Sequence, residues 1–151
     1  MANYFVECND SISTSTTIGS WIADATRPRR LALYEIHFGS ETSVDAAIQF
    51  CVSRITAEGT NTDVVPQPIN PADAATESDA GENHTVEPTY TNSALRLFTK
   101  SFHQRNGFRV NFAPGKYITF PATASNGFGC LTPTISTGTP ASTLGLYVEE
   151  Q

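Results

Sequence analysis

Residues 31–38 read LALYEIHF, and the alternation of their side chains decides the fold class. One set is Ala32, Tyr34, Ile36 and Phe38, and the other is Leu31, Leu33, Glu35 and His37. A period of two indicates a β-strand, in which successive side chains point to opposite faces. We expect the first set to form an inner face and the second a mixed outer face.

Neighbouring segments also predict strands. Residues 108–112 and 117–120 flank the turn sequence Ala113-Pro114-Gly115-Lys116, and this pattern predicts a hairpin. Residues 44–55 fit both helix and strand periodicity, and we favour a strand because a helix would leave Phe50 off its apolar face. The chain contains roughly seven or eight such segments and no βαβ alternation, which favours an all-β sandwich or barrel.

The 151 residues fit one domain, but two segments depart from the strand pattern. Residues 1–26 have some strand character, at Tyr4, Phe5 and Val6, but predict an N-terminal arm before a β-domain at 27–151. Residues 66–91, PQPINPADAATESDAGENHTVEPTYT, contain four prolines and five acids but no Lys or Arg. Proline excludes a continuous helix or central strand there, so we expect a long acidic loop of the kind that often binds a partner.

The charge excludes some partners. The net charge is −6 and the isoelectric point is near 4.9, which argue against a nucleic-acid or anionic-membrane surface. We interpret the basic cluster of Arg27, Arg29 and Arg30 as a solvent-exposed segment that precedes the next strand. The alternative is that it pairs with an acidic surface on a neighbouring subunit.

The sequence predicts a protein that is made in a cytoplasm and stays soluble. Its N-terminus, MANYFVECND, lacks the basic and apolar segments of a secretory signal, and no run of eighteen apolar residues occurs. Cys8, Cys51 and Cys130 are odd in number and far apart, so buried free thiols are expected rather than disulfides.

Motifs that carry enzyme chemistry are missing from the sequence, and we expect neither catalysis nor a cofactor. A triad drawn from His84, nearby acids and one of many serines has no supporting spacing. Glu77-x-Asp79-x-Gly81-Glu82 matches only part of a calcium loop, so a solvated polar loop without a metal is expected. Sugar binding by Trp21, Tyr90 and Tyr117 is a further possibility, although such aromatics more often form a core or an interface.

Several distinctive short motifs span most of residues 29–135. They are PADAATE at 71–77, AGENHTVEPTYT at 80–91, Gln104-Arg105, Ala113-Pro114-Gly115 and PATASNG at 121–127, together with the strand at 30–40. By these motifs the chain resembles a group of small virion-associated structural proteins of tailed bacteriophages. Residues 1–28 fall outside the resemblance.

The resemblance implies a β-sandwich protein on a phage particle, namely a capsid cement or decoration protein that binds and stabilises the shell of major capsid protein. We therefore expect a single-domain, jelly-roll-like β-sandwich, with the arm and the acidic loop, on the capsid surface of a virion. A homotrimer is expected from the class, because closed symmetry suits the threefold positions of a shell. The alternative is a carbohydrate-binding or host-recognition module of a phage fibre or tail.

The arm and the acidic loop are expected to form the assembly interface, because they have too few apolar positions for a core of their own. Trp21 is either an anchor onto its own domain or a contact with a neighbour. The candidate interface residues are Trp21, Arg27, Arg29, Arg30, Asp73, Glu77, Asp79, Glu82 and Tyr90.

Overall fold

The computed structural model describes residues 1–14, 16–41, 44–92, 95–135 and 138–151. In this part of the chain all regular elements are strands, and no helix is long and apolar enough to cross a membrane. The strands are β1 (Ala2–Ser11), β2 (Thr17–Ile22), β3 (Leu31–Glu41), β4 (Ala47–Ala57), β5 (Thr60–Val64), β6 (Gln67–Pro68), β7 (Asp79–Val86), β8 (Thr89–Tyr90), β9 (Arg96–His103), β10 (Phe108–Asn111), β11 (Ile118–Phe120), β12 (Gly127–Ile135) and β13 (Ala141–Glu150).

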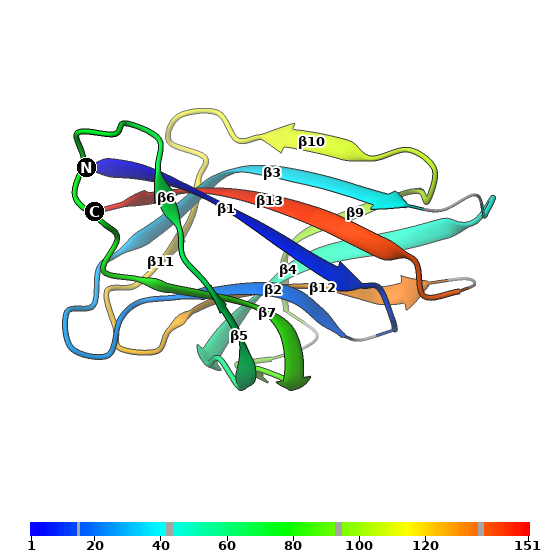
Figure 1. The fold of residues 1–151 in the computed structure, drawn as a ribbon, viewed down its shortest axis with the longest axis horizontal. Helices are drawn as coiled ribbons and strands as arrows, with labels where there is room; N and C mark the ends of the chain where they lie inside the picture. The colour runs from blue at the N-terminus through cyan, green and yellow to red at the C-terminus, as the bar shows by residue number, and fades with distance from the viewer. Residues whose placement is uncertain (15, 42–43, 93–94, 136–137) are drawn as a thin grey trace.

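Two antiparallel sheets pack face to face, and both termini lie at the same end (Figure 1). The six-stranded sheet has the order β10-β3-β13-β1-β6, with β11 also paired to β3. The seven-stranded sheet has the order β5-β7-β2-β12-β4-β8, with β9 also paired to β4. The predicted all-β, single-domain sandwich is therefore confirmed, and the strand predicted over 44–55 is found as β4 at Ala47–Ala57.

The core lies between the two sheets. Trp21, Phe50, Phe120 and Phe128 are the largest of its fully buried side chains. Phe120 stacks on Phe128 with ring centroids 4.8 Å apart. Burial of such aromatic side chains supplies most of the favourable free energy of folding.

The predicted inner and outer faces of β3 are correct for only part of the strand. Ile36 and Phe38 lie in the core as predicted, but Leu31 and Leu33 also lie there. The register of β13 against β3 shifts between Tyr147 and Val148, which leaves one extra residue in β3. A bulge of this kind reverses the alternation of side chains, so the assignment of Leu31 and Leu33 to the outer face is wrong.

The predicted hairpin over 108–120 is also wrong. β10 pairs with residues 35–38 of β3, and β11 pairs with residues 31–33 of the same strand. Because both run antiparallel to β3, they run in the same direction and form one interrupted edge strand. The turn at Ala113 to Lys116 forms, with the Lys116 amide donating to the Ala113 carbonyl over 2.8 Å, but it closes a protruding loop.

The N-terminal segment is not an arm. β1 pairs with β13 over its whole length, and β2 lies between β7 and β12. Ile12, Ile18 and Trp21 are fully buried in the core. The sequence pattern missed this because the partner of the first strand is the last one, so the segment is stabilised by contacts that local periodicity does not reveal. Residue 15 of the predicted arm lies outside the described residues.

The acidic segment 66–91 is not a free loop either. Its first part runs from the seven-stranded sheet to the six-stranded sheet and back, as the connection from β5 through β6 to β7 in Figure 1 shows. Hydrogen bonds fix it to both sheets: Tyr4 Oη donates to the Ala74 carbonyl over 3.0 Å, and Trp21 Nε1 donates to Ser78 Oγ over 2.7 Å. This part of the acidic segment therefore belongs to the domain.

The second part of the acidic segment crosses the outer face of the seven-stranded sheet, from β7 on one side to β8 on the other. Tyr90 Oη donates to Thr17 Oγ1 over 2.6 Å, and Thr17 Oγ1 donates to a Glu87 carboxylate oxygen over 2.5 Å. Gly129 lies beneath this crossing, where a Cβ would come within 2.6 Å of Tyr90 Oη. A side chain at position 129 would therefore displace the Tyr90 ring, which belongs to this segment.

Candidate functional site

The outer face of the six-stranded sheet carries a groove built from rows of side chains that cross four strands. One row is Glu7 on β1, Gly145 on β13, His37 on β3 and Arg109 on β10, each paired in register with the next. The adjacent row is Phe5, Tyr147, Glu35 and Asn111. The groove thus brings together residues that lie far apart in the sequence.

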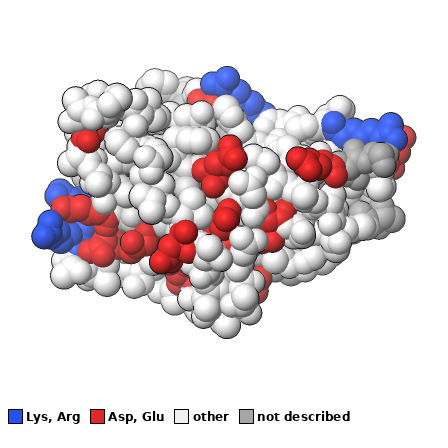
Figure 2. Space-filling model, viewed as in Figure 1, with Lys and Arg blue, Asp and Glu red and all other residues white. Residues whose placement is uncertain are grey.

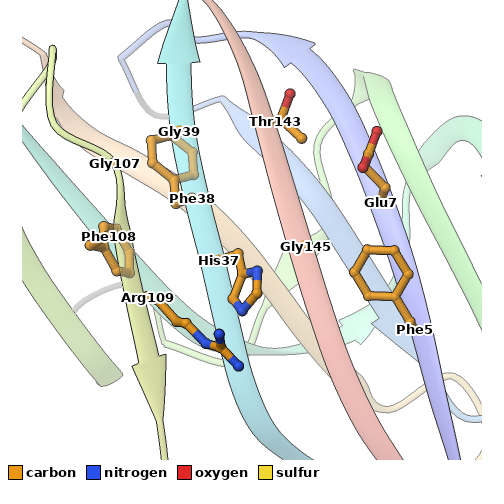
Figure 3. Close-up of a pocket in the computed structure, with 10 residues that line it drawn as sticks. All are labelled: Phe5, Glu7, His37, Phe38, Gly39, Gly107, Phe108, Arg109, Thr143 and Gly145. Atoms are coloured by element: carbon orange, nitrogen blue, oxygen red, sulfur yellow. The ribbon is translucent and has the colours of Figure 1, made fainter. Parts of the chain in front are cut away.

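Glycine forms the floor of the groove. A Cβ on Gly145 would lie 3.1 Å from Phe5 Cε2 and 3.4 Å from His37 Cβ, so the Phe5 ring leans over a position that carries no side chain. Figure 3 shows Phe5 and His37 on either side of Gly145, with Arg109 beside His37. The groove has a volume of about 520 Å³ and opens to solvent.

Aromatic rings continue from the groove across the sheet. Phe5 lies 4.7 Å from Tyr147 between ring centroids, Tyr147 lies 6.0 Å from Tyr34, and Tyr34 lies 5.8 Å from Tyr117. The His37 ring lies 5.2 Å from Tyr147. All these rings are half-buried. They form a continuous row of partly exposed rings beside the groove.

A buried carboxylate holds the charged end of the groove. Glu35 is almost fully buried, and its Oε1 accepts a hydrogen bond from Arg109 Nε over 2.6 Å and one from His37, while Oε2 accepts one from Asn111 Nδ2 over 3.0 Å. Burial acts to raise the pKa of Glu35, but the hydrogen bonds from Arg109 and His37 outweigh it and lower the pKa. Glu35 therefore stays charged and orients the exposed guanidinium of Arg109.

The predicted interface residues lie elsewhere, and part of that set comes together at one end of the sandwich. Arg27 Nη1 and Arg29 Nε each donate to the Glu77 carboxylate over 3.0 Å. These exposed ion pairs lie within the chain, so the basic cluster has an acidic partner of its own. Arg30 is exposed and pairs through its backbone with Gln151.

The two predicted anchors are directed inward. Trp21 is fully buried, and the prediction that it contacts a neighbour is wrong, whereas the alternative, an anchor within its own domain, holds. Tyr90 is largely covered and bonds to Thr17. Burial raises the pKa of the Tyr90 hydroxyl far above its usual range. Neither residue offers the exposed ring that an interface anchor or a sugar platform requires.

The remaining predicted acids lie on separate strands or turns. Asp79 and Glu82 belong to β7, where Glu82 accepts a hydrogen bond from the Asn9 amide over 2.6 Å. Asp73 lies in the turn before β7 and accepts from Asn70. Among the described residues no group of three or more His, Cys, Asp and Glu side chains is placed to hold a metal ion. The partial calcium-loop pattern at Glu77 to Glu82 therefore does not fold into a loop of converging oxygens.

A serine, a histidine and an acid do meet on the outer face of the seven-stranded sheet. Ser20 Oγ donates to Glu58 Oε1 over 2.9 Å and lies 3.0 Å from His84 Nε2. The acid contacts the serine and not the histidine, and Ser20 is fully buried. In a catalytic triad the acid bonds to the histidine and the nucleophile is accessible to substrate. This cluster meets neither condition, so we interpret it as a set of polar contacts within the fold.

The sequence contained only a weak signal for the groove. The alternation of 31–38 correctly placed Glu35 and His37 on an outer face. Phe5 and Tyr147 could be found only by pairing the first strand with the last, a contact that no local pattern encodes. Searches of protein-family models, of curated proteins and of solved structures found no match to this chain. The fold and the groove are therefore the basis for the function proposed below.

Proposed function

We propose that this protein is a structural component of a tailed-phage virion that binds the major capsid protein and stabilises the shell as a cement or decoration protein. The observation that carries the proposal is the groove with its aromatic row. Tyrosine, phenylalanine and arginine are the residue types enriched at protein interfaces, and here half-buried tyrosine and phenylalanine rings lie beside the exposed Arg109 on the outer face of a sheet.

The groove fits a segment of a partner protein. The groove has room for an apolar side chain beside the Phe5 ring, while Glu7 at one end and Arg109 at the other supply opposite charges. Arg109 is 67% exposed and is held by Glu35, so little side-chain entropy is lost when it binds. A protruding shell segment with a central apolar residue and flanking polar groups is the occupant we propose.

The order of the strands supports the same class of protein, a structural component of a virion. One sheet contains the order β1-β13-β3-β10 and the other the order β2-β12-β4-β9, and this strand order supports a jelly-roll topology for the sandwich. Viral capsid proteins and lectins both use this fold, so the support is an analogy of fold and does not choose between them.

A density map of the intact particle tests the proposal. The account predicts that the outer face of β1, β13, β3 and β10 rests on the shell, with density from the capsid protein between Phe5 and Arg109. A map in which that face points to solvent while another face touches the shell would contradict it. A map in which the protein sits on a fibre or tail would reject the cement role itself.

The second candidate is a host-recognition module that binds a glycan in the same groove. It is favoured by one observation: aromatic rings adjoin Arg109, His37, Glu7 and Thr143, and sugar sites combine ring platforms with such hydrogen-bonding groups. A glycan array decides between the two, because a recognition module binds particular glycans in isolation and a cement protein binds none.

A further inference from the structure

The seven-stranded sheet is open at both sides. β9 pairs with β4, β5 pairs with β7, and in the described part of the chain neither pairs with a further strand. An open edge strand presents backbone groups that can pair with another strand. The two edges therefore offer two places for strand addition.

The β5 edge is acidic. Asp63 on β5 and Asp79 on β7 are exposed, and within the described residues neither is in an ion pair with Lys or Arg. Burial raises the pKa of Asp79, and repulsion from Asp24 and Asp63 raises it further. Val65, next to this edge, is 71% exposed. Figure 2 shows the acidic side chains as a band across this side of the molecule, with Lys and Arg at its margins.

The β9 edge has the opposite charge. Arg96 and Lys100 are exposed on it, and among the described residues neither is in an ion pair. Arg96 donates to Gln49 Oε1 over 2.6 Å, which fixes it along the outer side of the sheet. Leu95 and Leu97 are 67% and 37% exposed beside these charges. A basic edge with apolar side chains thus lies across the sheet from an acidic edge with an apolar side chain.

We propose that the β5 edge of one copy docks against the β9 edge of a second copy, so that the seven-stranded sheet continues from one subunit into the next. Backbone hydrogen bonds join β5 of one copy to β9 of the other. In this contact Asp63 and Asp79 approach Arg96 and Lys100, and Val65 approaches Leu95 and Leu97. The contact is head to tail, and repeating it closes a ring or builds a filament. It uses a different surface from the groove and does not depend on the proposed shell binding.

Charged residues on edge strands also serve to prevent aggregation, and this is the competing explanation. Charges of one sign on both edges would repel every copy from every other. Here the two edges have opposite signs, so the head-to-tail contact is attractive while contacts between like edges are repulsive. That difference makes self-association the stronger inference.

Charge reversal tests the contact in purified protein by sedimentation velocity. The wild-type chain is expected to form oligomers as its concentration rises, and to dissociate at about 1 M salt, where the Debye length is roughly 3 Å. Lys100→Glu is expected to weaken association by roughly tenfold or more. Lys116→Glu makes the same change of charge on the loop between β10 and β11 and is expected to leave association unchanged.

Mixing two double variants makes the test specific. R96E/K100E and D63K/D79K should each be monomeric, because each carries charges of one sign on both edges. A mixture of the two should associate again, since every contact between unlike variants joins opposite charges. A wild-type chain that stays monomeric at every concentration would overturn the proposal. So would a mixture of the two variants that remains monomeric while the wild type associates.

Discussion

Arg109 Nε donates to Glu35 Oε1 over 2.6 Å, so an exposed guanidinium is held by a carboxylate that is itself almost fully buried. Glu35→Ala removes the acceptor for Arg109 and for Asn111. We expect this change to lower the free energy of unfolding by about 1 kcal/mol, because hydrogen bonds to a buried carboxylate are lost while the exposed donors Arg109 and Asn111 can bond to water instead. Urea unfolding measures it, and an unchanged midpoint would show that the network contributes nothing.

The same network predicts a dependence on pH. The folded pKa of Glu35 is lowered, so its contribution to stability is present above the unfolded value of about 4.3 and is lost as the pH falls through the folded value. The difference in stability between the wild type and Glu35→Gln should therefore be constant near neutral pH and should shrink below about pH 4. A stability difference that grows as the pH falls would mean that the folded pKa of Glu35 is raised and not lowered.

Removal of residues 1–20 should prevent folding. The deletion takes away β1, which pairs with β13, and the part of β2 up to Ser20, together with the buried Ile12 and Ile18. We expect a chain with no cooperative thermal transition, whereas the milder Trp21→Ala should remain folded but lose about 3–5 kcal/mol of stability. A deletion variant that melts cooperatively like the wild type would contradict this and would support the prediction that residues 1–26 form an arm.

His84 should make the protein less stable in mild acid. Burial lowers its pKa, and its Nδ1 is buried with no hydrogen-bond partner in the described structure. Its contribution is present above the unfolded value of about 6.5 and is lost as the pH falls through the lowered folded value. The difference in stability between the wild type and His84→Gln, measured by urea unfolding across this window, should therefore become less favourable to the wild type as the pH falls. A constant difference would mean that His84 does not titrate with folding.

The three thiols should be inert in the folded protein. Cys8, Cys51 and Cys130 are free and buried, and burial raises the pKa of Cys8 to about 12 and that of Cys130 well above its usual range. A thiol-specific reagent at about pH 8 should label none of them in the native protein and all of them in denaturant. Rapid labelling of one thiol under native conditions would indicate an opening that the fold does not account for.

Local patterns predicted several of the strands, among them β3 and β4, but not which strands pair. The apolar alternation at 31–38 reflects one buried face and identified β3, yet the bulge opposite Tyr147 and Val148 reversed the face of Leu31. The turn at Gly115 was correct as a turn, but the prediction of a hairpin failed because both flanking strands pair with β3. These errors share a cause, since register is set by the partner strand and not by the segment alone.

The acidic segment and the arm were misread for a related reason. Their few apolar residues did not suggest a core, but Trp21 is buried against Ser78, and polar bonds from Thr17 to Glu87 and Tyr90 fix the crossing segment. Hydrogen bonds between distant segments have no sequence period. The groove was missed likewise, because its rows cross four strands whose order in the sheet differs from their order in the chain.

Binding to empty shells tests whether the groove is the shell-binding surface. Shells of the phage that, on this proposal, encodes the protein are assembled without it and incubated with purified variants. The shells are then sedimented, and the bound protein is measured. Thr143→Trp places a large side chain in the groove without touching the Glu35 network, and Thr56→Trp makes the same change at an exposed position of β4. Thermal unfolding first establishes that both variants fold.

The account predicts that the wild type and Thr56→Trp co-sediment with shells, and that Thr143→Trp loses affinity by roughly tenfold or more, since a blocked interface centre removes most of the binding energy. Equal occupancy of Thr143→Trp and the wild type would contradict the assignment of the groove as the shell-binding site. A wild-type chain that never co-sediments with shells would contradict the proposed function.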